Sequence, residues 1–329
     1  MVSAYTDAQI DRYLEYIKIP PQFHRSAKPT LDLEFLTALH VHQLAAIPYE
    51  NLVLHYSKAH AVSLDPAVLY EKLLKNGRGG YCMENITFFN HILRALGFTE
   101  RGHDLALMGS PVEHILDGKH PQVLLLGCTV SAEIDALNRV HLVIIVALAD
   151  GSKYAVDVGF GGDGPTKPMP MIDGHVVQNL GTQEVRLVRG NIPEQVDRSQ
   201  KLWIYQYRNG VDKPWNSFYS FSEVEFLHQD FEVMNWYTSR NPQSFQTFTV
   251  LVVRYLRSEG ENHINGKVML VNGVVKRNLG ARTEVVVECT TEEERVEALD
   301  KYFGITLTEE EKEGIRGWGT ELGVEKVEV

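Results

Sequence analysis

A cysteine between a glycine-rich turn and an amphipathic segment is the feature that most constrains this chain. Cys82 follows the run Asn76-Gly77-Arg78-Gly79-Gly80-Tyr81. Apolar residues then recur at helical spacing, at Phe88, Phe89, Ile92, Leu93 and Leu96, before Gly97 supplies a left-handed stop. The pattern predicts that Cys82 lies in the first turn of a helix, where backbone N–H groups and the helix dipole favour thiolate over thiol. Gly79 and Gly80 are expected to leave room for a substrate to approach the backbone.

The other two cysteines have different surroundings. Cys128 and Cys289 lie in apolar runs of high β-propensity, so we interpret both as structural. Three cysteines in 329 residues argue against a disulfide framework and favour a reducing compartment, so a cytoplasmic protein is expected. No apolar run approaches the length of a membrane span, and no export-signal pattern opens the sequence, so a membrane protein is not expected.

The charge of the chain is unevenly distributed. Its net charge is −11 at pH 7, and residues 284–329 alone carry −9, from fourteen acidic and five basic side chains. The remaining chain is nearly neutral. It lacks the basic stripe of a nucleic-acid-binding surface, but an anionic cofactor could still bind through backbone N–H groups and a few cations.

The first hundred residues have the pattern of a helical unit. Thr6 and Gln9 form a capping box before an apolar stripe, a second helix is predicted over residues 31–46, and Asp65-Pro66 begins a third. Three histidines of this part have no metal-ligand companions at helical spacing, and we interpret them as surface or packed residues: His40, His42 and His55.

From about Arg101 the pattern changes to strands. The predicted strands are residues 123–126, 141–148, 153–158, 203–208, 247–256, 267–275 and 284–289. Between them a helix is predicted over residues 222–235, with Ser222 and Glu225 as its capping box, and further helices over 291–303 and from Thr308 onward. The class is therefore α+β, and 44% hydrophobic content suffices for two or three packed units.

Two polar side chains stand out in the predicted strands. His141 begins an otherwise apolar strand, and Asp157 lies among β-branched residues of the next, where an unpaired buried carboxylate would be costly. A two-residue turn between the strands would put them on opposite faces. A three-residue loop, Ala149-Asp150-Gly151 with Gly151 left-handed, would instead place Asp157 opposite Val143 and on the face of His141. We therefore predict an odd-length loop.

Three segments in order along the chain resemble those of the arylamine N-acetyltransferases. The nucleophile segment of that family resembles Arg78-Gly79-Gly80-Tyr81-Cys82-Met83-Glu84-Asn85. A second family segment is similar to Ile47-Pro48-Tyr49-Glu50-Asn51-Leu52, and a third to Val156-Asp157-Val158-Gly159-Phe160-Gly161-Gly162. Weaker similarity continues to about Val275. The departures are Tyr49 in place of the usual Phe, Ile86 after Asn85, and a long segment between Phe98 and His141.

The resemblance implies a fold. A helical N-terminal domain is expected over residues 1–100, a β-barrel domain over 101–210 and a C-terminal α/β lid over 211–329, with a cysteine-protease-like catalytic core in the first two. Residues 102–140 exceed the usual connection of the family, and such loops tend to be functional or disordered. We predict that residues 104–110 and 122–130 pair within the barrel and that 111–121 is exposed.

The resemblance also implies a chemistry. Cys82, His141 and Asp157 match the family's catalytic triad, which would transfer an acyl group from acetyl-CoA, or from malonyl- or propionyl-CoA, to an arylamine or arylhydrazine through an acyl-cysteine. No metal is expected. The natural acceptor, the preferred donor and the oligomeric state stay open.

Other residues take supporting roles in this interpretation. By the resemblance, Phe160 is expected to face the acyl group or the aromatic acceptor, although core packing is an equally good account of it. Phe160, Gly161 and, by a looser match, Thr247 are the expected contacts for the acyl-CoA cosubstrate. Arg78 is expected to pair with Glu50. A papain- or transglutaminase-like hydrolase would use the same triad in the same order, and a binding protein with an inactive site is a third possibility.

Overall fold

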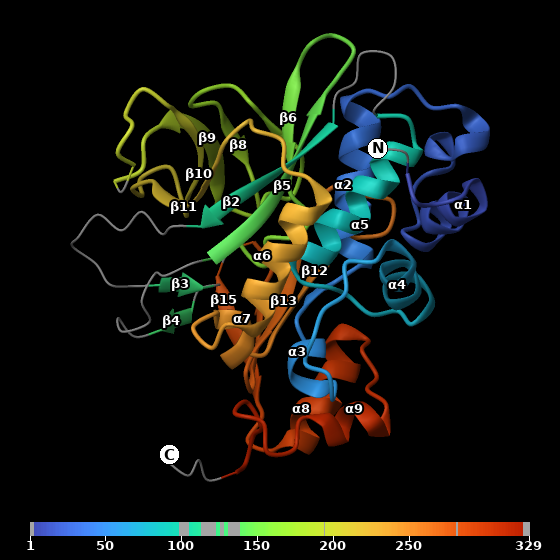
Figure 1. The fold of residues 1–329 in the computed structure, drawn as a ribbon, viewed down its shortest axis with the longest axis vertical. Helices are drawn as coiled ribbons and strands as arrows, with labels where there is room; N and C mark the ends of the chain where they lie inside the picture. The colour runs from blue at the N-terminus through green and yellow to red at the C-terminus, as the bar shows by residue number, and fades with distance from the viewer. Residues whose placement is uncertain are drawn as a thin grey trace.

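The computed structural model describes residues 3–98, 105–112, 123–125, 128–130, 139–193, 195–280 and 282–324. In these residues, helices come first, two four-stranded sheets follow, and a five-stranded sheet with further helices ends the chain (Figure 1). This arrangement confirms the predicted α+β class. No helix in the described part is long and apolar enough to cross a membrane.

The first hundred residues form helices, as predicted. They are α1 (Asp7–Tyr16), α2 (Leu33–Ala46), α3 (Val53–Tyr56), α4 (Pro66–Tyr70) and α5 (Cys82–Ala95), with short 3-10 turns at Pro21–Phe23 and Arg25–Ala27 and a π-turn, Glu71–Lys75, that continues α4. The predicted capping box of Thr6 and Gln9 is present at α1. α2 begins two residues later than predicted because the Asp32 side chain caps it by accepting from the Phe35 N–H.

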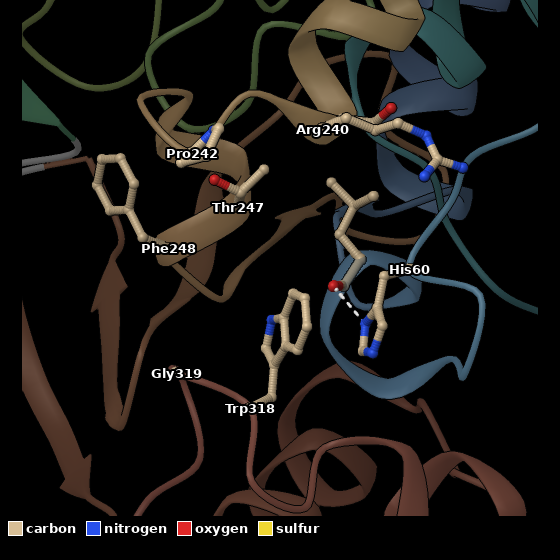
Figure 2. A pocket seen from close by; sticks show the side chains of 9 residues that line it. His60, Arg240, Pro242, Thr247, Phe248, Trp318 and Gly319 are labelled. Atoms are coloured by element: carbon tan, nitrogen blue, oxygen red, sulfur yellow. Dashed lines mark hydrogen bonds between the residues drawn. The ribbon is translucent and has the colours of Figure 1, made fainter. Parts of the chain in front are cut away.

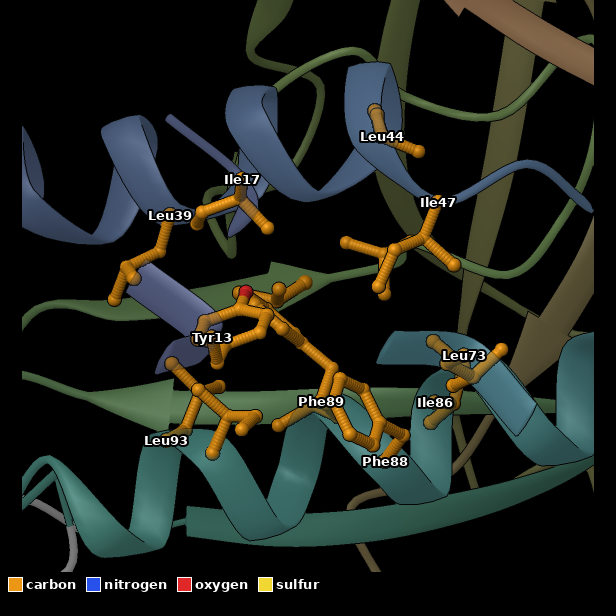
Figure 3. Close-up of a cluster of buried hydrophobic side chains, with 14 of the residues drawn as sticks. Tyr13, Ile17, Leu39, Leu44, Ile47, Leu73, Ile86, Phe88, Phe89 and Leu93 are labelled. Atoms are coloured by element: carbon orange, nitrogen blue, oxygen red, sulfur yellow. The ribbon is translucent and has the colours of Figure 1, made fainter. Parts of the chain in front are cut away.

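Helices α1, α2 and α5 bury their apolar faces in a common core. Figure 3 shows its central side chains, among them Tyr13, Ile17, Leu39, Leu44, Ile47, Leu73, Ile86, Phe88, Phe89 and Leu93, all buried. Burial of apolar area at about 25 cal/mol per Å² is the main source of stability here. Because α5 begins at Cys82 and also packs on β5, this core fixes the cysteine relative to the strands.

The middle of the chain forms two four-stranded sheets in the described residues. The first has the order β2-β5-β6-β7, with β2 (Leu105–Val112), β5 (Arg139–Ala147), β6 (Lys153–Val156) and β7 (Met169–Pro170). The second has the order β11-β10-β9-β8, with β8 (Val176–Gln178), β9 (Glu184–Gly190), β10 (Leu202–Arg208) and β11 (Asn216–Phe221). The two sheets share one buried core, to which Val143 and Tyr205 contribute, and β11 lies beside β2.

The expected β-barrel therefore takes the form of two facing sheets. No ladder of hydrogen bonds joins them into a closed barrel in the part of the chain that the structure describes. The division into domains at 100 and 210 stays a prediction. β11, which lies beyond 210, nevertheless pairs with β10, so this sheet extends past the predicted boundary.

The β5–β6 hairpin has the predicted register. Ile144 pairs with Val156 and Ala147 with Lys153, and the Leu148 N–H closes the ladder on the Ser152 carbonyl at 2.8 Å. The connecting loop is thus three residues long, and Gly151 in it has φ of +85°. This odd-length loop, which the sequence predicts, places Asp157 on the same face as His141.

The long segment before β5 agrees with the prediction only in part. β2 pairs with β5 within the sheet, in agreement with the prediction for residues 104–110, but it continues through Pro111 and Val112, the start of the stretch predicted to be exposed. Proline is tolerated there because β2 is an edge strand. The predicted pairing of residues 122–130 within the barrel is wrong, since β3 (Val123–Leu125) and β4 (Cys128–Val130) pair with each other and with no other described strand. The remainder of 111–121 lies outside the described residues.

The last third of the chain builds a five-stranded sheet and its helices. The sheet has the order β1-β12-β13-β14-β15, with β1 (Tyr49–Glu50), β12 (Leu251–Leu256), β13 (Gly266–Val271), β14 (Val274–Asn278) and β15 (Thr283–Glu288). The helices are α6 (His228–Arg240), α7 (Phe245–Phe248), α8 (Glu292–Ala298), continued by a π-turn at Leu299–Phe303, and α9 (Glu309–Gly314). Because β1 pairs with β12, the N-terminal and C-terminal parts of the chain share this sheet.

Two predictions for this part are wrong. The helix predicted over residues 222–235 begins instead at His228, where the Asp230 carboxylate accepts from the Leu227 N–H at 2.8 Å. Ser222 caps no helix; its hydroxyl accepts from the Val224 N–H in the turn after β11. The strand predicted from Thr247 begins only at Leu251, because α7 precedes it.

Candidate active site

Cys82 is the first residue of α5, as predicted. The Tyr81 N–H donates to Glu84 Oε2 at 3.1 Å and so caps the helix one residue before the cysteine. The turn before it is packed closely against the rest of the chain. A Cβ atom on Gly79 would overlap the Pro48 carbonyl oxygen, and one on Gly80 would lie 2.6 Å from Glu84 Cβ. The expectation that these glycines leave room for a substrate is therefore wrong, since the protein's own atoms occupy that space.

His141 and Asp157 form a buried hydrogen-bonded pair. His141 Nε2 lies 2.8 Å from Asp157 Oδ2, and because a carboxylate only accepts, the ring nitrogen donates. Asp157 Oδ2 also accepts from the Tyr219 hydroxyl at 2.9 Å, and Oδ1 accepts from the Gly159 N–H at 3.0 Å. These donors satisfy a buried carboxylate and leave Nδ1 as the other, basic nitrogen of the imidazole.

The loop after Asp157 brings this pair to the cysteine. A Cβ atom on Gly159 would lie 3.1 Å from both the α-carbon and the carbonyl oxygen of Cys82, and 2.8 Å from Ile86 Cγ1. Only glycine fits so close to the start of α5. α5 also packs on β5, which carries His141. The structure thus joins His141 to Asp157 and places the loop after Asp157 against the start of α5, while a catalytic triad of the three residues stays a prediction.

Burial controls the protonation of the cysteine. It raises the pKa of the Cys82 thiol to about 12, which outweighs the lowering by the Met83 backbone N–H; the charge of Asp157 raises the pKa further. The backbone N–H groups at the helix start lower this pKa, in the predicted direction, but burial has the larger effect. A thiolate at Cys82 requires a neighbouring base, and the imidazole of His141 is the group that the geometry offers.

Phe160 and Gly161 continue the loop beside His141. The half-buried Phe160 ring meets the imidazole edge-on, with the ring centroids 5.1 Å apart, and contacts Phe218 and Tyr219 at the same separation. Gly161 has φ of +93°, and its carbonyl accepts from the Tyr255 hydroxyl at 2.5 Å. Phe160 thus forms an aromatic wall next to the imidazole, while the predicted contacts of both residues with a substrate stay predictions.

Thr247 lies in a different place. Its hydroxyl lies 2.8 Å from the carbonyl oxygen of Ser244 and 3.1 Å from that of Asn241, and it donates to these two oxygens, which both precede α7. It lines a cavity of about 430 Å³ between α7, the loop around His60 and the C-terminal segment, shown in Figure 2. The other lining residues are Leu54, His60, Ser239, Arg240, Pro242, Phe248, Trp318 and Gly319. The three predicted catalytic residues are not among those that line this cavity.

A network of charged side chains holds the turn before Cys82. Arg78 Nη2 pairs with the fully buried Glu50 at 3.2 Å, which confirms that prediction, and the same guanidinium pairs with Glu311 of α9. Lys72 Nζ lies 2.7 Å from Glu84 Oε1. Buried charges need partners, and these pairs connect the turn before Cys82 to β1 and to α9.

Two of these residues escaped the sequence interpretation. Tyr219 lies in a run, Phe218-Tyr219-Ser220-Phe221, that is buried throughout and so gives no alternation of polar and apolar residues. The aromatic content of residues 216–221 was the available signal for a strand. Glu311 has the pattern of a solvated helix start, and nothing local indicates that it reaches Arg78.

The histidines of the helical part are packed, as interpreted. His40 Nε2 lies 3.1 Å from the Pro165 carbonyl, His42 Nδ1 lies 3.0 Å from the Ile17 carbonyl, and His55 Nδ1 lies 3.0 Å from Thr320 Oγ1. Among the residues that the structure describes, no group of His, Cys, Asp and Glu side chains has the arrangement to hold a metal ion.

Comparison with known proteins identifies the family of the chain. The sequence profile of the N-acetyltransferases matches residues 32–121 and 122–312. The chain belongs to the arylamine N-acetyltransferase family, and it is an acyltransferase by class. This membership favours acyl transfer over the hydrolase alternative, which rested on the same three residues.

Individual relatives refine the comparison. N-malonyltransferase FDB2 from Fusarium pseudograminearum (strain CS3096) is 34% identical over 94% of this chain and 92% of its own length. The arylamine N-acetyltransferase of Escherichia coli (strain K12) is 30% identical over 72% of this chain and 71% of its own. The structure of Mycobacterium marinum arylamine N-acetyltransferase in complex with CoA has a TM-score of 0.70 at 21% identity, covering 94% of this chain and 99% of that one, and so shares its fold.

Proposed function

We propose that this protein transfers a short acyl group from acyl-coenzyme A to an arylamine or arylhydrazine by a ping-pong mechanism, with Cys82 as nucleophile, His141 as general base and Asp157 as the residue that orients His141. The observation that carries the proposal is the 2.8 Å bond between His141 and Asp157, placed by Gly159 against the backbone of Cys82. Membership of the acyltransferase family supports it.

The first half-reaction acylates the cysteine. His141 takes the proton of the Cys82 thiol, which burial otherwise holds at a pKa of about 12. The sulfur attacks the thioester carbonyl carbon, the bond from that carbon to the sulfur of coenzyme A breaks, and the imidazolium returns the proton to the departing thiolate. In this proposal, backbone N–H groups at the start of α5, which begins at Cys82, stabilise the oxyanion. Exchange of one thioester for another is nearly balanced, so the acyl-cysteine can persist.

The second half-reaction forms the amide. A neutral arylamine attacks the acyl-cysteine carbonyl, His141 takes a proton from the nitrogen, and the Cys82 sulfur leaves and recovers a proton as the thiol. Amide formation is favourable relative to the thioester and drives the cycle forward. The half-buried ring of Phe160 beside His141 is a suitable surface for the acyl group or the aromatic acceptor.

The choice of donor is part of the proposal. The named activity of the 34% identical relative makes malonyl-CoA a donor to compare directly with acetyl-CoA. The bound CoA of the Mycobacterium marinum structure supports coenzyme A as the carrier in this fold. We also propose a cytoplasmic location, on the cysteine argument given above.

Mass spectrometry of the protein after incubation with each acyl-CoA tests the mechanism. One acyl group should appear on Cys82 and should disappear when an aniline is added, with one equivalent of amide formed. Cys82→Ala should remove both events. Cys289→Ala is the matched control, because that buried cysteine lies in the C-terminal sheet region and away from the triad, and it should keep full acylation.

Two results would contradict the proposal. Acylation of Cys82 followed by release of free acid at the same rate with and without amine would indicate a hydrolase. Equal acylation of folded Cys82→Ala and wild-type protein would exclude Cys82 as the nucleophile.

A further inference from the structure

We infer that Lys267 is a positioning residue for the reaction with aromatic acceptors, because it holds the loop after Asp157 so that the Phe160 ring keeps its place beside His141. This inference rests on the proposed function, in which Phe160 offers a surface to the acceptor. Lys267 lies on β13, in the C-terminal sheet, so it acts on the site through the loop rather than on the substrate.

The loop from Gly161 to Pro165 is held by side chains from five parts of the chain. Each of its backbone carbonyls accepts a hydrogen bond from one of them. The donors are the Tyr255 hydroxyl for Gly161 (2.5 Å), Lys267 Nζ for Gly162, the Tyr205 hydroxyl for Asp163 (3.1 Å), Asn179 Nδ2 for Gly164 (3.1 Å) and His40 Nε2 for Pro165 (3.1 Å). They lie on β12, β13, β10, the residue after β8 and α2. The loop backbone therefore cannot shift without breaking several of these bonds at once.

Lys267 makes the strongest of these connections. Its side chain is buried, and Nζ donates both to the Gly162 carbonyl and to Asp163 Oδ1, which lies 2.9 Å away. Hydrogen bonds from a charged donor are about twice as strong as those between neutral groups. A buried ion pair is nevertheless a weak source of stability, since apolar side chains of similar volume often serve as well. What an apolar side chain could not supply is the pair of bonds that fixes two successive residues of the loop.

The segment that Lys267 holds lies directly against Phe160. The Gly164 N–H donates to the Gly161 carbonyl at 3.4 Å, so the loop turns back on itself. A Cβ atom on Gly164 would lie 3.1 Å from Phe160 Cβ and 3.8 Å from its Cδ1, so the backbone of Gly164 supports the aromatic side chain. The same ring meets the His141 imidazole edge-on. Movement of residues 162–164 would therefore move the Phe160 ring relative to the imidazole.

Deacylation of acetylated Cys82 by two acceptors tests the inference. The ring of 4-methylaniline needs an aromatic surface, whereas hydrazine has no ring. Lys267→Met keeps a long side chain but removes the charge and the donor. It should lower the deacylation rate constant for 4-methylaniline at least about tenfold relative to that for hydrazine, the loss expected when an apolar contact is misplaced. A smaller fraction of folded protein would instead lower both rates by the same factor.

Two further variants complete the comparison. Lys267→Met leaves the Asp163 carboxylate without its cation, so Tyr255→Phe provides a milder change: it removes only the hydroxyl that binds the Gly161 carbonyl. The ratio of the two rate constants should fall about two- to tenfold in this variant, as expected for one neutral hydrogen bond. Lys213→Met is the matched control, because it removes an exposed lysine that pairs with Asp212 at 3.1 Å, and it should keep the wild-type ratio.

Hydrogen exchange followed by mass spectrometry gives a readout that does not depend on catalysis. Peptides that cover residues 159–166 should exchange faster in Lys267→Met and Tyr255→Phe than in the wild type and in Lys213→Met. A wild-type ratio of rate constants in both folded variants, or wild-type exchange of residues 159–166, would overturn the role of Lys267. Failure of the wild-type protein to form acetylated Cys82, or of 4-methylaniline to release the acetyl group, would instead contradict the proposed function. Hydrogen exchange would then still decide whether Lys267 holds the loop.

Discussion

Asp157 connects three parts of the chain at the scale of single atoms. It accepts from the imidazole of His141 on β5, from the hydroxyl of Tyr219 on β11 and from the backbone of Gly159 in its own loop. A carboxylate with its acceptor sites occupied in this way cannot rotate, so the imidazole that it binds has one orientation. Burial and the charge of Asp157 raise the pKa of Tyr219 well above its usual value, so the hydroxyl stays a donor at any physiological pH.

We expect Tyr219→Phe to reduce the rate of Cys82 acylation while leaving the protein folded. The substitution removes one hydrogen bond to a buried charged group, which is worth about 1.5–3 kcal/mol, and frees Asp157 and His141 to change orientation. Unfolding in urea and acylation kinetics measure the two effects. Tyr207→Phe is the control, because that buried tyrosine on β10 has no hydroxyl hydrogen bond with the described residues. Equal acylation by both variants would show that Tyr219 does not position the pair.

The meeting of His141 and Asp157 could be predicted from the sequence, whereas the third partner could not. Whether a hairpin loop has an odd or an even number of residues depends on the local sequence, and glycine at position 151 indicates where the left-handed residue lies. Tyr219 reaches Asp157 from another sheet, and that contact depends on how two sheets face each other. No pattern within residues 216–221 carries that information.

At the scale of elements, α9 packs directly against the backbone of α3 at a glycine, Gly314. A Cβ atom on Gly314 would overlap the Tyr56 carbonyl oxygen, so the C-terminal helix approaches the backbone of α3 as closely as glycine allows. The same helix carries Glu311, which pairs with Arg78 before Cys82. The position of α9 is thereby coupled to the turn before Cys82.

Gly314→Ala should destabilise the protein, although alanine is the better helix former. The gain in helix propensity is about 1 kcal/mol at most, whereas overpacking against a backbone atom costs about 1–3 kcal/mol and displaces α9. Urea unfolding gives the sign. Gly319→Ala is the matched control, since no atom lies within 4 Å of its added Cβ, and it should change the free energy of unfolding by less than about 0.5 kcal/mol. A stabilised Gly314→Ala would contradict this packing.

Local signals predicted some elements better than others. The capping box of Thr6 predicted the start of α1, and the helices predicted from Thr291 and Thr308 also begin there, where both threonines cap the helix by accepting from a backbone N–H three residues later. The same signal failed at Ser222, where a competing acidic cap at Asp230 lies further along. β7 has two residues and β8 has three, which is too few for an alternation of apolar and polar residues to be recognised.

At the scale of the whole molecule, the ends of the chain close on each other. β1 follows α2 in sequence but pairs with β12, and Leu52 and Tyr56 pack in the same core as Val250 and Ile315. The sequence predicted neither contact, because a two-residue strand has no pattern of its own and its partner lies about 200 residues away. The segment that carries Glu50 thus lies among the N-terminal helices in the sequence, but its backbone pairs with the C-terminal sheet.

Buried histidines distributed through the fold should make its stability depend on pH. Burial lowers the pKa of His40, His55 and His91 to about 4 in each case. In the unfolded chain the pKa of an imidazole is near 6.5. Below that pH these histidines bind protons in the unfolded state but stay neutral in the native state. The free energy of unfolding should therefore be constant above about pH 6.5 and fall as the pH decreases toward 4, by at most about 1.4 kcal/mol per pH unit for each histidine.

Replacing one of these histidines separates this effect from general acid unfolding. His91 Nδ1 accepts from the Ala4 backbone N–H at 3.4 Å, a bond that needs the neutral ring and that glutamine can replace through its side-chain oxygen. In urea titrations between about pH 6.5 and 4.5, His91→Gln should lessen the pH slope of the unfolding free energy by the share of one histidine. His175→Gln, at an exposed position, should keep the wild-type slope. If the His91→Gln slope equals that of the wild type while the protein is equally stable at neutral pH, His91 does not resist protonation in the fold, and carboxylates rather than buried imidazoles govern the acid response.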